Sequence, residues 1–226
     1  TRGGVNVDFF KRWSREMAYV LGYFAADGCL AVNPLGARYV HFDSIDRSQL
    51  KAVKSLMRSK HLIGIKHKAK GSRHTCYRLQ IGSRQLFQDL EQLGFGVRKE
   101  RRMRFPKVPL VFLPDFVRGY FDGDGGLSYG EYGRKNRPGK TRCILLHFTS
   151  ASIEFLKDMR RNLQRHAGTG KGCLCLYGTY GRLSYAKSDI AHLSRFMYGT
   201  QSNPGNSFLK RKHVKLVKGL QFCSRG

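Results

Sequence analysis

The chain has 226 residues, and 42 lysines and arginines against 15 aspartates and glutamates give it a formal net charge of +27 at pH 7. Because 41% of its residues are hydrophobic, it can build a packed core, which excludes a disordered basic tail. No stretch of 18 apolar residues is present, so neither a membrane span nor a secretory signal is expected. A foldable chain of this charge points to nucleic acid as its partner.

The cysteines do not predict a zinc site or a disulfide framework. The six are Cys29, Cys76, Cys143, Cys173, Cys175 and Cys223, and none forms a Cys-x-x-Cys pair. Cys173 and Cys175 are two apart in an expected strand, so they should lie side by side on one face. Unpaired cysteines fit a reducing compartment. The sequence leaves open whether that compartment belongs to an organelle (mitochondrion or chloroplast) or is a bacterial cytoplasm.

The sequence contains an internal repeat. Residues 21–30, LGYFAADGCL, and residues 118–127, RGYFDGDGGL, are identical at six of ten positions. His-Phe-x-Ser follows each copy, at residues 41–44 and 147–150, and the larger spacing in the second half indicates an insertion of about nine residues. We place it in residues 129–142, whose Gly, Arg and Lys content predicts a long hairpin loop.

Hydrophobic spacing predicts the same order of elements in both halves. In the first half we expect a helix over residues 9–26 with Asp8 as N-cap, strands over 28–32 and 38–44, a helix over 46–59, a hairpin over 64–69 and 74–81, and a helix from Ser83 to residue 93. In the second half we expect a helix over 114–123, strands over 126–132 and 142–149, a helix over 152–165, strands over 172–178 and 182–187, a helix over 188–198 and a basic helix over 206–218. The predicted division is residues 1–95, a proline-containing linker over 96–113, and residues 114–226.

Each copy of the repeat ends a predicted helix with an Asp-Gly pair, Asp27-Gly28 and Asp124-Gly125. Small residues four apart precede each pair, Gly22 and Ala26 in the first copy and Gly119 and Gly123 in the second, so two helices can approach closely there. The glycines after the aspartates suit the left-handed conformation that ends many helices. Carboxylates in a last helical turn are disfavoured by the helix dipole, and a divalent cation such as Mg²⁺ would compensate two that converge. The alternative is that Asp-Gly only forms the turn into a hairpin, twice.

The two copies, residues 20–28 and 117–125, resemble the motif of the LAGLIDADG homing endonucleases in their single-chain, two-motif form. The resemblance implies an α+β fold of two pseudo-symmetric αββαββα halves, with the motif helices at their interface and antiparallel sheets forming a DNA-binding saddle. It implies a monomer that binds a double-stranded DNA target of about 20 base pairs, at about ten per helical turn. Such an enzyme of intron homing hydrolyses one phosphodiester per strand with Mg²⁺ or another divalent cation and leaves short 3′ overhangs.

The resemblance also assigns residues. The last acid of each copy, Asp27 and Asp124, becomes the catalytic metal ligand, with Gly28 and Gly125 beside it in the metal site. The earlier acid position is Asp122 in the second copy and Ala25 in the first. One basic residue per half is implied near the cleaved phosphates, Lys99 and Lys212.

Alternation along the predicted strands selects the side chains that would face DNA. They are Tyr39, His41, Asp43, His74, Arg78, Gln80, Arg182 and Ser184. The basic loops over residues 66–74 and 134–142, including Arg134 and Lys135, are expected to contact the DNA backbone.

Two other functions stay open. A maturase would bind its intron RNA through the same basic surface, and positive charge does not separate RNA from DNA. A DNA-binding regulator that does not cleave would keep the fold, although regulators derived from this family usually lose the two acids, which are both present here.

Overall fold

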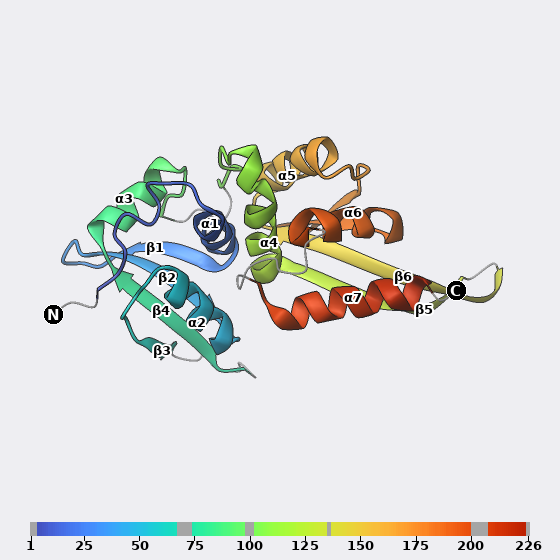
Figure 1. Cartoon of the computed structure of the whole chain (residues 1–226), viewed down its shortest axis with the longest axis horizontal. Coiled ribbons are helices and arrows are strands. Elements are labelled where there is room, and N and C mark those ends of the chain that lie inside the picture. Colours follow the sequence, from blue (N-terminus) through green and yellow to red (C-terminus); the bar gives the residue numbers. More distant parts are fainter. Residues whose placement is uncertain (1–3, 67–73, 98–101, 135–136, 200–207, 225–226) are drawn as a thin grey trace. The chain divides into compact units, whose positions relative to one another are not determined.

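A computed structural model of the chain (Figure 1) describes residues 4–66, 74–97, 102–134, 137–199 and 208–224. The chain divides into two compact units, Thr1–Gly123 and Asp124–Gly226. In the described residues, each unit contains one four-stranded antiparallel sheet packed with helices. None of the helices in this part of the chain has the length and apolar character that a membrane span needs.

The first unit is built from a helix and two hairpins with further helices between and after them. In chain order its elements are α1 (Arg15–Asp27), β1 (Gly28–Val32), β2 (Arg38–Ser44), α2 (Arg47–Leu56), β3 (Ile63–Lys66), β4 (Cys76–Gly82), α3 (Arg84–Gln92), a 3-10 turn (Leu110–Phe112) and α4 (Leu113–Asp124), whose last residue begins the second unit. Its sheet has the strand order β1-β2-β4-β3. Asp46 and Ser83 cap α2 and α3 by accepting backbone N–H groups of the first turn.

The second unit repeats this order. Its elements are β5 (Gly125–Arg134), β6 (Arg137–Ser150), α5 (Ile153–His166), β7 (Cys173–Tyr177), β8 (Tyr180–Tyr185), α6 (Lys187–Tyr198) and α7 (Lys210–Ser224). The strand order β5-β6-β8-β7 corresponds strand by strand to that of the first sheet. The predicted α+β fold of two repeated halves is therefore confirmed.

The predicted start of the first helix is wrong. Ser14, not Asp8, is the N-cap of α1, because its Oγ accepts the backbone N–H of Met17 at 3.1 Å. Asp8 instead forms an ion pair with Lys11 in a preceding turn. Phe9 and Phe10 are buried in that turn, and their apolar character extended the helical pattern beyond the true start.

The predicted loop over residues 129–142 is also wrong, because β5 and β6 continue through it as a ladder. Tyr132 pairs with Thr141, and Glu131 pairs with Arg142. The last helix supports this extension, since the Phe222 ring of α7 lies 5.5 Å from the Tyr129 ring and 5.1 Å from the Arg142 guanidinium. The inserted residues therefore lengthen two strands.

The helices α1 and α4 pack through two glycines, as the spacing of small residues predicted. An ideal Cβ at Gly22 would lie 2.0 Å from the carbonyl oxygen of Phe116, and one at Gly119 would lie 2.0 Å from that of Tyr19. No side chain fits at such distances, so the two backbones are in direct contact. This contact fixes where the ends of the two motif helices lie in the first unit.

Candidate functional site

The two aspartates of the repeat occupy the positions that the sequence predicts. Asp27 is the last residue of α1 and Asp124 is the last residue of α4, and Gly28 and Gly125 begin the strands that follow. Gly28 does not adopt the predicted left-handed conformation, since its φ is −87°. The glycine is required for another reason: a Cβ there would lie 2.1 Å from the Phe24 ring, which covers it.

Asp27 is half-buried at the end of α1. An ideal Cβ at Gly123 would lie 2.4 Å from the Cβ of Ala26 and 3.2 Å from Oδ2 of Asp27. The end of α4 up to Gly123 therefore lies against the carboxylate of Asp27. Burial, followed by the negative charge of Asp27, raises the pKa of the Tyr23 phenol far above its usual value, so this neighbour stays protonated.

The earlier acid position, Asp122, is part of a buried polar network that joins α4 to α1. Asp122 is 3% exposed and accepts a hydrogen bond of 2.8 Å from the Tyr19 hydroxyl, which itself accepts one of 2.5 Å from Gln49. Arg118 lies 5.6 Å from the Tyr19 ring centre and pairs with Asp115 at 2.5 Å. Sequence patterns do not predict this network, because its members lie on three different helices.

Around Asp124 the second unit brings together groups from three elements. The Thr149 hydroxyl donates to the carbonyl oxygen of Asp124 at 2.9 Å, and Nζ of Lys212 donates to the carbonyl oxygen of Gly125 at 2.6 Å. Lys212 therefore lies at the Asp-Gly pair of its own half. A cavity of about 370 Å³ opens beside them, lined by Asp124, Thr149, Ser150, Ala151, Tyr180 and Arg182.

The corresponding part of the first sheet carries an ion-pair cluster. Arg78 donates to both carboxylate oxygens of Asp43, at 2.7 and 2.8 Å, and Lys66 donates to one of them at 2.9 Å. Partial burial by itself would raise the pKa of Asp43, but the hydrogen bonds from Arg78 and Lys66 outweigh it and hold that pKa below its usual value. Asp43 is therefore ionised at neutral pH.

Residues 14–93 match the family model of the LAGLIDADG-like domain. The matched residues lie in the first of the two units. No curated protein sequence matches the chain.

Solved LAGLIDADG meganucleases share the fold over most of the chain. I-AabMI bound to uncleaved DNA has a TM-score of 0.60 at 13% identity, over 92% of this chain and 90% of that one. The K262A mutant of I-SmaMI has a TM-score of 0.64 at 12% sequence identity, and the match covers 92% of this chain and 90% of that one. I-SmaMI bound to cleaved DNA has a TM-score of 0.61 at 13% sequence identity, and the match covers 93% of this chain and 88% of that one. The resemblance stated from the repeat is confirmed, and the single-chain, two-motif fold extends beyond the LAGLIDADG-like domain to both halves.

The remaining residues predicted to face DNA differ in exposure. In the LAGLIDADG-like domain His74 and Gln80 are exposed and Tyr39 is half-buried, whereas His41 is only 7% exposed. Arg182 and Ser184 of the second sheet are half-buried, opposite the buried Leu183 and Tyr185. Lys99, Lys135, the side chain of Arg134 and most of the loop over residues 66–74 lie outside what the structure describes.

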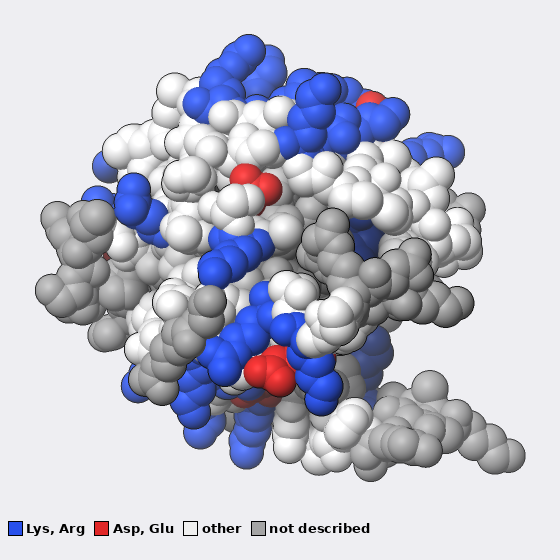
Figure 2. Space-filling model, turned by 90° about the vertical axis from the view of Figure 1, so that its right-hand side faces the viewer, with Lys and Arg blue, Asp and Glu red and all other residues white. Residues whose placement is uncertain are grey.

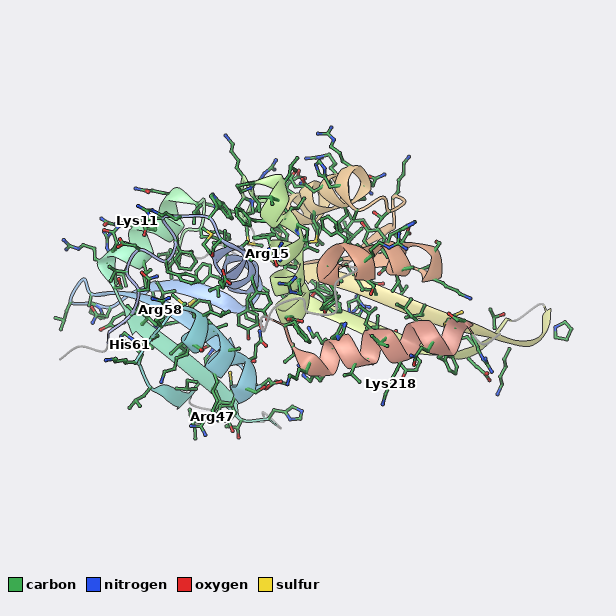
Figure 3. The ribbon with its side chains drawn as sticks, in the orientation of Figure 1. Lys11, Arg15, Arg47, Arg58, His61 and Lys218 are labelled. Carbon is green, nitrogen blue, oxygen red and sulfur yellow. The ribbon has the colours of Figure 1, made fainter. Side chains whose placement is uncertain are left out.

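Basic side chains extend beyond the sheets. Figure 2 shows lysines and arginines spread over one face, with few acidic side chains among them. Arg47 begins α2, with its guanidinium 5.8 Å from the Tyr77 ring, and Lys218 projects from α7 (Figure 3). Such a surface attracts a polyanion.

The carboxylates at the motif ends fit an oxygen-preferring cation such as Mg²⁺ better than Zn²⁺. Among the described residues, no group of three or more histidines, cysteines, aspartates and glutamates lies close enough to hold a metal. Mg²⁺ needs no such cage, because it is commonly bound by one or two carboxylates together with water and substrate phosphates. Half-buried carboxylates that end two helices supply this kind of ligand.

Proposed function

We propose that the protein is a sequence-specific, double-strand DNA endonuclease that hydrolyses one phosphodiester in each strand with a divalent cation. The observation that carries the proposal is the placement of Asp27 and Asp124 as the last residues of two helices that touch through Gly22 and Gly119. This arrangement puts a carboxylate where the helix dipole disfavours it. If Asp-Gly served only to form a turn, placing a carboxylate at the unfavourable end of a helix twice would bring no advantage.

In this function Asp27 and Asp124 each serve as a ligand for a divalent cation, with Gly28 and Gly125 beside them. A bound divalent ion lowers the pKa of a water and stabilises charge on the attacking and leaving oxygens. Lys212, held at the Gly125 carbonyl, stabilises the negative charge that develops on the phosphate. Lys99 takes the same role in the first half, because the family resemblance places the basic residue of that half at this position.

The substrate class follows from charge and fold. The net charge of +27 suits a phosphate backbone, and antiparallel strands can lie in the major groove. I-AabMI and I-SmaMI were solved with DNA, and I-SmaMI also with calcium ions. We infer a single chain that binds about 20 base pairs, at about ten per turn, and leaves short 3′ overhangs as an enzyme of intron homing.

The test is cleavage of a randomised duplex DNA pool with Mg²⁺, followed by sequencing of the new ends. The wild type is compared with the Asp27→Asn, Asp124→Asn double variant. A matched control is Asp158→Asn, which removes one carboxylate that pairs with Arg161 on its own helix. Defined ends from the wild type and from the control, but not from the double variant, support the proposal.

Other outcomes point to the other functions. Cutting by the double variant overturns the assignment of the two acids. Selective DNA retention without cutting, with Mg²⁺ or Mn²⁺ present, identifies a regulator. Preference for structured intron RNA over duplex DNA of the same length identifies a maturase.

A further inference from the structure

The two sheets place an arginine at equivalent positions but surround it differently. In the first sheet Arg78 of β4 pairs with Asp43 of β2, and in the second Arg182 of β8 pairs with Thr149 of β6. Asp43 and Thr149 are the variable third residue of the repeated His-Phe-x-Ser sequence. The repeat therefore keeps the arginine and changes the residue opposite it.

In the first sheet this arginine is neutralised. Two of the N–H groups of Arg78 donate to the Asp43 carboxylate, and Lys66 adds a third donor. The hydrogen bond to Asp43 raises the pKa of Arg78. The guanidinium stays protonated, but two of the N–H groups that a phosphate would need are already used by Asp43, and the carboxylate beside it repels a phosphate.

In the second sheet the arginine keeps its charge. The residue opposite it in the ladder is Thr149, whose hydroxyl is directed to the carbonyl oxygen of Asp124, so the carboxylate that Asp43 supplies in the first sheet has no counterpart at this position. The guanidinium lies 5.0 Å from the centre of the Tyr177 ring. Its Nε is buried and has no hydrogen-bond partner in the described part of the chain, which is costly unless a ligand supplies the acceptor.

This orphaned donor belongs to the lining of the cavity of about 370 Å³ at the end of α4. The other polar groups of the lining are the hydroxyls of Thr149, Ser150 and Tyr180 and the carboxylate of Asp124. A cation with hydroxyls around it is suited to an anion. The Asp124 carboxylate repels an anion, and a divalent cation bound there in the proposed function would offset that repulsion.

We propose that this cavity, the Arg182 pocket, binds a backbone phosphate of a DNA strand next to Asp124, and that the equivalent position of the first sheet does not. The inference rests on the proposed function. It assigns Arg182 to a phosphate instead of a base edge. It also means that the two halves contact the DNA backbone differently, because only the C-terminal half has this phosphate contact.

The test introduces a carboxylate opposite Arg182, in the position that Asp43 occupies opposite Arg78. Binding to a fluorescent duplex of random sequence is measured by anisotropy against KCl concentration, with Ca²⁺ present. Arg182→Gln should reduce the slope of log K against log salt by about 0.9, the value for one phosphate contact, and Thr149→Asp should do the same. Thr149→Asn, which has nearly the same shape without the charge, should leave the slope unchanged.

A double variant separates pairing with Arg182 from general repulsion by the new carboxylate. If Thr149→Asp acts by neutralising Arg182, it should change the slope little once Arg182→Gln is present. Arg78→Gln should leave the slope unchanged, and Asp43→Thr should increase it by releasing Arg78. Thermal melting checks that each variant folds. If Thr149→Asp does not fold, the result for Arg182→Gln alone decides the test.

An unchanged slope for Arg182→Gln, or an equal loss for Arg78→Gln, overturns the inference. Failure of the proposed function looks different. In that case the wild type binds the duplex in this assay but produces no defined ends from the randomised pool.

Discussion

At the scale of single residues, Gly22 and Gly119 decide how closely the motif helices pack. A Cβ at either position would lie 2.0 Å from a backbone oxygen of the other helix, and backbone atoms cannot rotate away as a side chain can. We expect Gly22→Ala to lower the free energy of unfolding by about 1–3 kcal/mol, the usual cost of overpacking. Urea unfolding followed by circular dichroism measures it.

The matched control is Gly64→Ala in β3. An ideal Cβ at Gly64 meets no atom within 4 Å, and the substitution removes the same backbone freedom. If both alanine variants unfold at the same urea concentration, the close helix contact is not present in solution.

Two histidines on the strands next to the motif ends give a second prediction at this scale. Burial, followed by the charge of Arg78 for His41 and of Arg182 for His147, lowers the pKa of both imidazoles. Each is therefore neutral in the folded protein at a pH where it is already protonated in the unfolded chain. By linkage, stability is complete above about pH 6.5, the ordinary pKa of histidine, and falls as the pH drops below it.

The measurement is urea unfolding at pH 7.5 and pH 5.5. The wild type should lose stability at the lower pH, and a His41→Gln, His147→Gln variant should lose less, because the substituted side chains do not titrate. An equal loss in the two proteins would show that other groups cause the pH dependence.

At the scale of elements, the sequence predicted those whose pattern is local. The strands over residues 28–32 and 38–44 were predicted with the correct bounds, because alternating burial is visible in the residues themselves. Ser83 and Ser152 begin helices as their capping chemistry indicates. Cys173 and Cys175 lie side by side as predicted, with their Sγ atoms 3.3 Å apart.

The elements that were missed depend on contacts distant in the sequence. Residues 129–142 look like a loop by composition, but in the structure they pair with each other as β5 and β6 and contact α7. The contrast between Arg78 and Arg182 was missed for a similar reason, since it depends on which strands are neighbours in each sheet. Its only local sign was the change from Asp43 to Thr149 within the repeated His-Phe-x-Ser.

The long hairpin can be tested through Phe222. This ring contacts Tyr129 and the Arg142 guanidinium, so Phe222→Ala should remove the support of β5 and β6. We expect faster amide hydrogen exchange at residues 130–133 and 140–143 and unchanged exchange in β1–β4. Lys218→Ala, an exposed substitution in the same helix, is the control. Equal protection in both variants would mean that the ladder is stable without α7.

At the scale of the whole molecule, the repeat and the charge have separate roles. The repeat provides each half with a helix that ends in an acid and a sheet of the same strand order. The charge of +27 is not repeated in any fixed pattern and acts on any polyanion. The affinity that this charge supplies should therefore be the same for any DNA sequence, whereas cleavage should depend on the two acids.

Salt dependence tests the first half of that statement. If the wild type contacts about six to ten phosphates, its affinity for a random duplex should fall by about 10³–10⁵ between about 50 and 200 mM KCl. Asp27→Asn, Asp124→Asn should bind at least as tightly, because it removes two negative charges. A duplex with an uncharged methylphosphonate backbone is the control and should show almost no salt dependence. A flat response with ordinary DNA would mean that the positive charge does not contact the phosphates, and the chain would then have to recognise its partner by shape.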